Sequence, residues 1–223
     1  MEVRLLSRKE VESLQIPVTE VMDVVEKGFA LKGKDAMEMP AKIGIHPRKD
    51  CFIHAMPCFV GGGADVAGIK WVSGYPLNQA KGLPYITGVM CLNDPETGFV
   101  KVIMDANWIT AWRTGAATGV CARHMADPDS RVLAVIGLGV QGRTNAAALA
   151  AALPKVEKVK VYDKHAEQVP RFLELVKEDL KGIEVLPCAT VEETVSEADV
   201  VVTCTPIVND PERFVRSEWL KKD

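Results

Sequence analysis

Apolar positions recur with two different spacings along the chain, and these spacings divide it into segments. Residues 3–6 are a candidate for a short apolar strand, and Ser7 with Glu10 has the spacing of a capping box, which predicts a helix that reaches Leu14. Across residues 17–33, apolar side chains return every three or four positions, which predicts an amphipathic helix. Two helices are therefore expected after the first strand.

From Met39 to Val102 the pattern changes to short apolar or alternating runs separated by Gly, Pro, Asn and Asp. The expected strands cover residues 42–45, 51–55, 66–72, 86–92 and 100–104. A strong turn signal separates the last two of these runs. The pattern predicts an antiparallel or mixed sheet that packs against the N-terminal helices.

Residues 107–125 predict a long helix, and the polar break that follows it is where we expect a domain boundary. Strands and helices then alternate. The expected strands are residues 132–137, 159–162, 183–186 and 200–205, and the expected helices are residues 140–153, 165–181 and 191–197. This alternation predicts right-handed βαβ units and a parallel sheet. The expected fold class is therefore α/β, with domains at residues 1–126 and 127–223.

Composition and charge narrow the possible functions. Of the 223 residues 48% are hydrophobic, which is ordinary for a globular protein. The net charge is −3 and the charged residues are dispersed, so the sequence has no basic stripe of the kind that predicts nucleic-acid binding. No stretch approaches the about 18 apolar residues of a membrane span, and the first residues lack a signal-peptide core. A soluble cytoplasmic protein is expected. The six cysteines form no CxxC pair, which predicts reduced thiols and no metal site.

The clearest chemical motif is a GxGxxG pattern at residues 137–142. Alone it is weak, but here it directly follows a predicted strand and directly precedes a predicted helix. Gly137 allows the tight turn, Gly139 lets the backbone approach a pyrophosphate, and Gly142 lets the helix pack close to the strand. The pyrophosphate would lie at the start of the helix, beside Val140 and Gln141, where free N–H groups favour negative charge.

An acidic residue follows at the expected distance. Asp163 ends the next strand, and a carboxylate there can accept hydrogen bonds from the adenosine ribose and would repel a 2′-phosphate. This predicts NAD(H) over NADP(H), a preference that the neighbouring Lys164 could soften. Thr205, at the end of the fourth strand, is a candidate contact for the cofactor's ribose or nicotinamide side. The alternative is that the glycines are ordinary turn residues and that Asp163 caps a helix.

Five short runs precede this motif. They are residues 68–72 (GIKWV), 81–84 (KGLP), 94–98 (DPETG), 104–106 (MDA) and 113–117 (RTGAA). Together they resemble the ornithine cyclodeaminase/mu-crystallin family, and the segment around the last of them looks closest to the family's archaeal type of alanine dehydrogenase. The resemblance implies an α/β domain for substrate binding and dimerisation, followed by a doubly wound Rossmann sheet, and hence a homodimer.

The resemblance also implies roles for single residues. Lys70 matches the family's active-site lysine, and Arg113 matches the arginine that holds the substrate carboxylate. Lys42 stands where many members have a second carboxylate-binding arginine. Polar side chains near the cofactor are implied at Thr87, Thr114 and Thr118.

These roles are reasonable as chemistry. A carboxylate needs a fixed cation, and an arginine fork gives two parallel hydrogen bonds. The amine must lose its proton before hydride leaves Cα, and a lysine can take that proton only if its pKa falls well below the usual value of about 10.4. Burial beside Arg113 and a charged nicotinamide ring would lower the pKa of Lys70. The alternatives are a strand lysine with its amine in solvent and a solvated helix arginine.

Two features depart from the family. His54 stands where ornithine cyclodeaminases have a glutamate and the alanine dehydrogenase branch has an arginine, so it is either a substrate ligand or a buried structural histidine. The sequence also ends earlier than family members do. This predicts an incomplete Rossmann sheet that lacks the segment with a catalytic aspartate.

Three functions remain open. The first is an NAD(H)-dependent oxidoreductase that interconverts a small L-amino acid and its imino or 2-oxo acid. The second is ornithine cyclodeamination to proline, or reduction of a cyclic ketimine. The third is a non-catalytic protein that binds a nucleotide or another small molecule. Net NADH formation separates the first from cyclodeamination, which regenerates NAD in each cycle.

Overall fold

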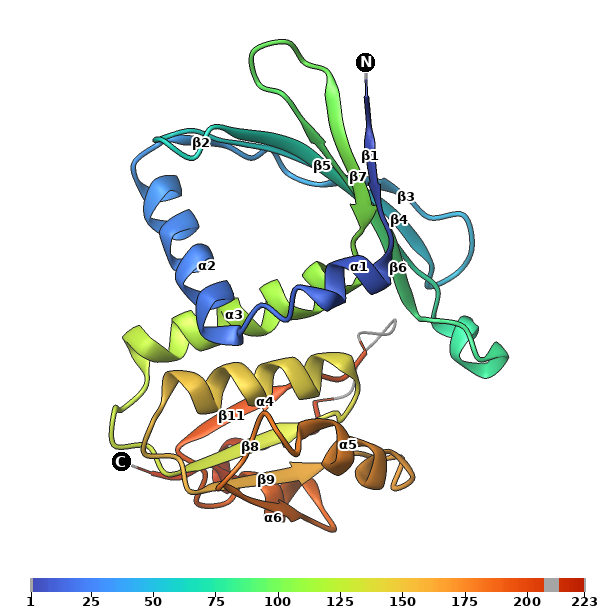
Figure 1. Ribbon diagram of the computed structural model, residues 1–223. Helices are drawn as coiled ribbons and strands as arrows, with labels where there is room; N and C mark the ends of the chain where they lie inside the picture. The colour runs from blue at the N-terminus through green and yellow to red at the C-terminus, as the bar shows by residue number, and fades with distance from the viewer. Residues whose placement is uncertain (1, 207–212, 223) are drawn as a thin grey trace. The chain divides into compact units, whose positions relative to one another are not determined.

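The computed structural model describes residues 2–206 and 213–222 of a mixed α/β chain (Figure 1). Contacts between residues divide the chain into two compact units. The first unit comprises Met1–Ile16 and Glu26–Thr110, and the second comprises Pro17–Val25 and Ala111–Asp223. Within the described ranges, no helix is long and apolar enough to span a bilayer.

A seven-stranded sheet forms most of the first unit. Its strands are β1 (Arg4–Leu6), β2 (Met37–Glu38), β3 (Ile43–Ile45), β4 (Phe52–Val60), β5 (Val66–Gly74), β6 (Ile86–Asn93) and β7 (Val100–Asp105). The order across the sheet is β1-β7-β6-β5-β4-β2, and β3 also pairs with β4. Among these pairs only β1 and β7 run parallel, and the others are antiparallel. The sheet is therefore mixed, which is one of the two forms, antiparallel or mixed, that the sequence predicted.

Short helices flank this sheet. The helix α1 (Arg8–Ser13) begins at the predicted capping box, in which the side chains of Ser7 and Glu10 each bond the other residue's backbone N–H. It packs against β7. The 3₁₀ helix η1 (Pro76–Lys81) lies in the connection between β5 and β6, where no helix was predicted.

The strand β4 is longer than predicted because it continues through a proline. Pro57 lies opposite Ile69 of β5. On its other side, β3 pairs only as far as Ala55 and β2 begins to pair at Phe59. Pro57 therefore stands at a gap between partners, where its missing N–H leaves no ladder bond unmade.

The second unit contains a four-stranded parallel sheet of order β10-β9-β8-β11. Its strands are β8 (Val132–Ile136), β9 (Lys158–Tyr162), β10 (Glu184–Pro187) and β11 (Val200–Thr203). The helices between them are α4 (Val140–Ala152), α5 (Gln168–Val176) and α6 (Val191–Val195), and η2 (Ser217–Trp219) follows β11. The predicted parallel βαβ arrangement is confirmed.

Two long helices contribute residues to both units, namely α2 (Val18–Gly33) and α3 (Asn107–Met125). The two units therefore do not meet at a single boundary near residue 126. Parts of α2 and α3 belong to the second unit because they pack closely against its helices. A Cβ at Gly115 of α3 would lie 2.3 Å from the carbonyl oxygen of Thr144 in α4, and one at Gly119 would lie 2.9 Å from that of Ala148. Met22 of α2 also touches Gly119.

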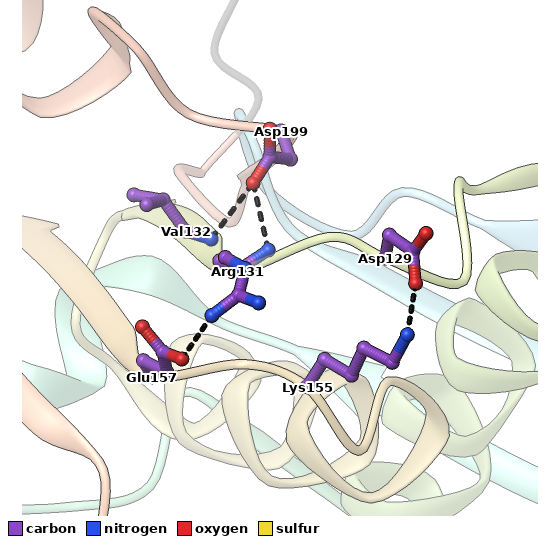
Figure 2. A network of polar contacts seen from close by, with 6 residues as sticks. All are labelled: Asp129, Arg131, Val132, Lys155, Glu157 and Asp199. Atoms are coloured by element: carbon purple, nitrogen blue, oxygen red, sulfur yellow. Dashed lines mark hydrogen bonds and ion pairs between the residues drawn. The ribbon is translucent and has the colours of Figure 1, made fainter.

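A carboxylate joins the beginnings of two neighbouring strands in the second unit (Figure 2). Asp199, just before β11, accepts hydrogen bonds from the backbone amides of Arg131 at 2.8 Å and Val132 at 2.9 Å. Its other oxygen accepts one from the ammonium of Lys221 at 2.6 Å. Burial raises the pKa of Asp199, but these hydrogen bonds outweigh burial, and the net pKa is lowered.

Candidate functional site

The glycine motif forms a tight loop between β8 and α4. Gly137 has a φ of +92°, and a Cβ there would lie 2.8 Å from the carbonyl of Cys204. A Cβ at Gly142 would lie 2.1 Å from the carbonyl oxygen of Gly137. Neither position has room for a side chain. By contrast, a Cβ at Gly139, the N-cap of α4, would meet nothing within 4 Å, so the backbone at this residue is open to a ligand.

The start of α4 completes a place for an anion. No side chain caps the helix at Gly139, so its first amides, among them those of Val140 and Gln141, are available to an incoming acceptor. This geometry fits the pyrophosphate of a dinucleotide. The backbone is exposed at Gly139, and the close packing at Gly137 and Gly142 holds the loop in a tight turn.

Asp163 lies directly beside this loop. One of its carboxylate oxygens accepts a hydrogen bond from the amide of Leu138 at 2.8 Å, and the other accepts one from the amide of His165 at 2.9 Å. A carboxylate offers about four acceptor positions, so capacity for two ribose hydroxyls remains. The side chain thus lies at the end of β9, where the sequence predicted an acidic group.

The end of β11 closes the other side of the loop. The amide nitrogen of Thr205 lies 3.0 Å from the Cβ position of Gly137, which places Thr205 next to the glycine motif. Burial raises the pKa of the neighbouring Cys204 thiol to about 11, so this thiol stays neutral at physiological pH.

The helix α3 brings more of the predicted residues beside α4. Gly115 meets Thr144 of α4, so Thr114 and the exposed Arg113 lie at the level of the first two turns of that helix. Partial desolvation lowers the pKa of the Arg113 guanidinium. Thr118, whose hydroxyl donates to the carbonyl of Thr114 at 3.5 Å, lies one turn farther along α3.

One residue at this place was missed by the sequence analysis. Arg143, directly after the last glycine of the motif, stands 5.6 Å over the ring of Trp112 of α3 and donates to the carboxylate of Asp179 at 3.2 Å. It therefore fastens α3 to the beginning of α4. The only signal in the sequence was a cation next to the glycine motif, which does not reveal either partner.

In the first unit, Lys70 lies on β5, and only 7% of the residue is exposed. Its register partners are Met56 of β4 and Met90 of β6. Because alternate residues of a strand point to opposite faces, these three side chains share one face of the sheet, which we call the Lys70 face. Arg113 belongs to the other unit.

His54 lies on the Lys70 face, since its partner Val72 is two residues from Lys70. Its ring stacks on that of Phe52 at a centroid distance of 4.3 Å, and the ring of His46 stands edge-on at 6.2 Å. Burial lowers the pKa of His54, and the charges of Lys42 and His46 lower it further. The structure therefore brings His54 together with the predicted Lys42.

Thr87 is placed differently from the other predicted residues. It pairs with Ser73 of β5. Ser73 and Thr87 are an odd number of residues along their strands from Lys70 and Met90, so their side chains point away from the Lys70 face. Thr87 is exposed on the opposite face of the sheet, and its carbonyl accepts a hydrogen bond from the Ser73 hydroxyl. The structure therefore does not bring Thr87 together with Lys70, because a shift of one residue along a strand reverses the face.

The opposite face also carries a shallow hollow of about 380 Å³, lined mainly by apolar residues such as Pro57, Phe59 and Ile69. It lacks the predicted site residues. In the parts of the chain that the structure describes, no group of three or more His, Cys, Asp or Glu side chains is placed to hold a metal ion.

Comparison with known sequences gives a family and several relatives. The model of the ornithine cyclodeaminase/mu-crystallin family matches residues 1–222. The nodulation efficiency protein NfeD of Rhizobium meliloti is 38% identical over 220 residues, which are 99% of this chain and 67% of that protein. Alanine dehydrogenase of Archaeoglobus fulgidus is 36% identical over 222 residues, which are 100% of this chain and 65% of that protein.

Solved structures agree with these matches. The Δ¹-pyrroline-2-carboxylate reductase of Thermococcus litoralis, in complex with NADH and L-proline, superposes with a TM-score of 0.90 at 33% identity, over 98% of this chain and 66% of the other. An archaeal alanine dehydrogenase dimer with bound NAD has a TM-score of 0.84 at 35% identity, over 99% and 65%.

This chain thus spans about two thirds of the length of these relatives. The match covers both units, including the glycine motif and the strand that carries Lys70. By its sequence and by its fold, the chain belongs to the ornithine cyclodeaminase/mu-crystallin family.

Proposed function

We propose that this chain is part of an NAD(H)-dependent oxidoreductase that interconverts a small L-amino acid and its imino or 2-oxo acid. The observation that carries the proposal is the glycine loop beside Asp163. Gly137 and Gly142 have no room for a side chain, Gly139 is open, and the Asp163 carboxylate lies against the loop. The relatives with NAD or NADH in their structures support the same cofactor.

The residues of the second unit would hold the cofactor. The first amides of α4, at Val140 and Gln141, would donate to the pyrophosphate, and Asp163 would accept from the adenosine ribose. Thr205 would line the loop from the end of β11. Bound there, the nicotinamide supplies a hydride acceptor or donor.

The substrate roles follow from charge and burial. Arg113 would hold the substrate carboxylate through its planar fork, and Thr114 would lie beside it on α3. Lys70 would take a proton from the substrate amine before Cα is oxidised, and return it in the reverse direction. Water then adds to the imine and releases ammonia, which gives the 2-oxo acid.

A cyclic substrate is the second candidate. The reductase from Thermococcus litoralis, whose structure contains L-proline, has a TM-score of 0.90 with this chain. In that case the same Lys70 would exchange its proton with a ring nitrogen, and no ammonia would be released. Ammonia release therefore separates a linear substrate from a cyclic one.

We further propose that the protein acts as a homodimer through the face of the first sheet opposite Lys70. This face exposes large apolar side chains, namely Leu5, Ile43, Ile45, Phe59, Trp71 and Val89. Such a patch on a soluble protein is typical of an interface.

The proposal is tested by titrating the chain with NADH and with NADPH while the nicotinamide fluorescence is recorded. We expect NADH to bind at least about tenfold more tightly, because Asp163 would repel a 2′-phosphate. In Asp163→Ser this preference should largely disappear, whereas Glu174→Ser, an exposed carboxylate on α5, should keep it. Equal affinities in the unmodified chain would contradict the NAD assignment.

Turnover is measured in the same preparation as NADH formed from NAD with a panel of L-amino acids, and as NADH consumed with imino acids. Net NADH formation supports the dehydrogenase. Nucleotide binding without turnover in either direction would favour a binding protein over an enzyme.

A further inference from the structure

One basic side chain beside the glycine motif has two partners in the fold, and the proposed function gives it no role. Arg143 directly follows Gly142 in the first turns of α4. Its Cζ lies 5.6 Å from the centre of the Trp112 ring, and its Nε and Nη2 atoms both donate to one carboxylate oxygen of Asp179 at 3.2 Å. Because Asp179 already balances its charge, the Arg143 guanidinium connects elements of the fold and is poorly suited to hold an anion.

Trp112 lies on the side of α3 that packs against α4. Gly115 and Gly119 follow it at helical spacing on the same side, and a Cβ at these positions would lie 2.3 Å and 2.9 Å from carbonyl oxygens of α4. Glycines allow two helices to approach closely, but they have no side chains that interlock with the neighbouring helix. The contact between Trp112 and Arg143 adds this interlocking at the beginning of α4.

The rotation of α3 about its axis determines where Arg113 points, because Arg113 directly follows Trp112. Successive residues of an α-helix are about 100° apart around the axis, so a helix that is fixed at one of them has a fixed direction at the next. Partial desolvation lowers the pKa of the Arg113 guanidinium, and none of the described carboxylates contributes to this shift. Arg113 is therefore suited to an anionic ligand in a way that Arg143 is not.

We propose that Arg143 is a positioning residue, which holds Trp112 and thereby directs the neighbouring Arg113 toward the substrate carboxylate. This inference rests on the proposed function, in which Arg113 binds that carboxylate. Arg143 itself needs no contact with the substrate or with the dinucleotide. The residues concerned, with Asp179, all belong to the second unit, so the role is defined within that unit.

The two ligands of the second unit should depend differently on Arg143. The dinucleotide loop is held by the close packing of Gly137 and Gly142 and by the hydrogen bond from Leu138 to Asp163, and the Arg143 side chain takes part in neither. The carboxylate, by contrast, depends on the direction of a helix, and a displacement of about 1 Å can reduce a rate about a hundredfold. Loss of Arg143 should therefore impair carboxylate binding and spare NADH binding.

The first test uses pyruvate as a carboxylate probe and follows the arginine Nε–Hε groups by NMR. Pyruvate should shift the Arg113 signal of the unmodified chain, and its Kd should rise about tenfold in Arg143→Met. Arg143→Lys keeps a cation beside Trp112 and Asp179, so its Kd should stay within about threefold of the original value. Arg171→Met, at an exposed arginine of α5, is the matched control and should leave the Kd unchanged.

The second test compares turnover with NADH affinity in the same variants. In Arg143→Met, kcat/KM for the best L-amino acid of the panel should fall about 10–100-fold, while the Kd for NADH stays within about twofold. Arg143→Lys should restore most of kcat/KM. Trp112→Leu should resemble Arg143→Met, and the double variant should be no worse than either single one, because both changes remove the same contact.

Thermal unfolding verifies that each variant is folded. If Arg143→Met does not fold, Asp179→Asn replaces it, since this change keeps the shape of the side chain and removes the charge that holds Arg143. It should raise the Kd for pyruvate about threefold.

The outcomes separate the positioning role from the proposed function. If NADH binds and amino acids turn over, but Arg143→Met changes neither pyruvate affinity nor kcat/KM, the positioning role is refuted and the proposed function stands. If pyruvate binding at Arg113 depends on Arg143 but no nucleotide binds to the unmodified chain, the positioning role is supported and the proposed function fails. Equal losses of NADH and pyruvate affinity, an Arg143→Lys as impaired as Arg143→Met, or no shift of Arg113 with pyruvate would each overturn the proposal.

Discussion

Lys70 has an ammonium group at a strand position where only 7% of the residue is exposed. Its neighbours across the sheet are two methionines, Met56 and Met90, whose side chains are apolar. Lysines are almost never buried this far without a specific reason, because desolvation disfavours the charged form. This burial supports the role of Lys70 in proton transfer.

We predict that Lys70→Met lowers kcat by about 10²–10⁴-fold and leaves the Kd for NADH unchanged. Methionine keeps much of the buried stem and removes the amine, so the fold should survive, which circular dichroism and thermal unfolding would verify. Lys49→Met is the matched control. Turnover of Lys70→Met at the rate of the unmodified chain would exclude the proposed role.

Some residues could be placed from the sequence because their position depends on local backbone geometry. Others could not, because their position depends on contacts between strands or helices that are distant in the sequence. The requirement for Gly137 and Gly142 follows from their spacing between a predicted strand and a predicted helix, and the structure leaves no room for a side chain at either. The position of Thr87 on the far face, and the pairing of Arg143 with Trp112, depend on register and helix packing. Local spacing does not determine these.

At the scale of elements, Asp199 links the beginnings of β8 and β11. It accepts the backbone amides of Arg131 and Val132 and the ammonium of Lys221. Around it, ion pairs join Lys155 to Asp129 and Arg131 to Glu157 (Figure 2). These exposed pairs contribute little, whereas amides that lose their acceptor are costly.

We predict that Asp199→Ala lowers the free energy of unfolding by about 1–3 kcal/mol at neutral pH, because two strand amides lose their acceptor. The folded pKa of Asp199 is lowered, so its stabilisation is present above the unfolded pKa of about 3.9 and is lost as the pH falls through the folded value. The difference from the unmodified chain should therefore shrink below about pH 4.

Urea unfolding at several pH values measures this difference, with Glu178→Ala on the surface as the control. A loss of stability that stays the same at every pH would show that the carboxylate charge of Asp199 contributes nothing.

Most elements were predicted because their apolar spacing is regular. The helix α3 occupies the predicted residues 107–125, and β6, β7 and β8 end within one residue of the prediction. β4 was predicted too short because Pro57 normally ends a strand, and only the gap between β3 and β2 makes it acceptable there. α5 is shorter than predicted, with Pro170 in its first turn.

At the scale of the whole molecule, one face of the first sheet is apolar and exposed. Trp71 is 48% exposed and Ile43 is 70% exposed on this face. The short apolar and alternating runs predicted an antiparallel or mixed sheet that packs against the N-terminal helices, but they did not reveal that large apolar side chains would be exposed on one of its faces. The sequence pattern predicted two domains with one boundary, but it did not indicate that residues 17–25 join the second unit, where Met22 packs on Gly119.

We predict that the chain sediments as a dimer of its 24.3 kDa protomer and that Trp71→Lys shifts it to monomer, with a Kd raised at least about a hundredfold. Leu77→Lys, at an exposed position of η1, should leave the dimer intact. A monomeric unmodified chain, or a dimeric Trp71→Lys, would contradict an interface on this face.

The hydrogen bond from the Leu138 amide to Asp163 makes one side chain serve two purposes. The group that would discriminate between the two dinucleotides also holds the loop that would receive their shared phosphates. A substitution that admits a 2′-phosphate therefore removes a constraint on the loop as well. Evolution or engineering toward NADP(H) would have to restore that constraint elsewhere, so a substitution at Asp163 can remove the preference for NADH, whereas tight binding of NADP(H) should need a second substitution that holds the loop.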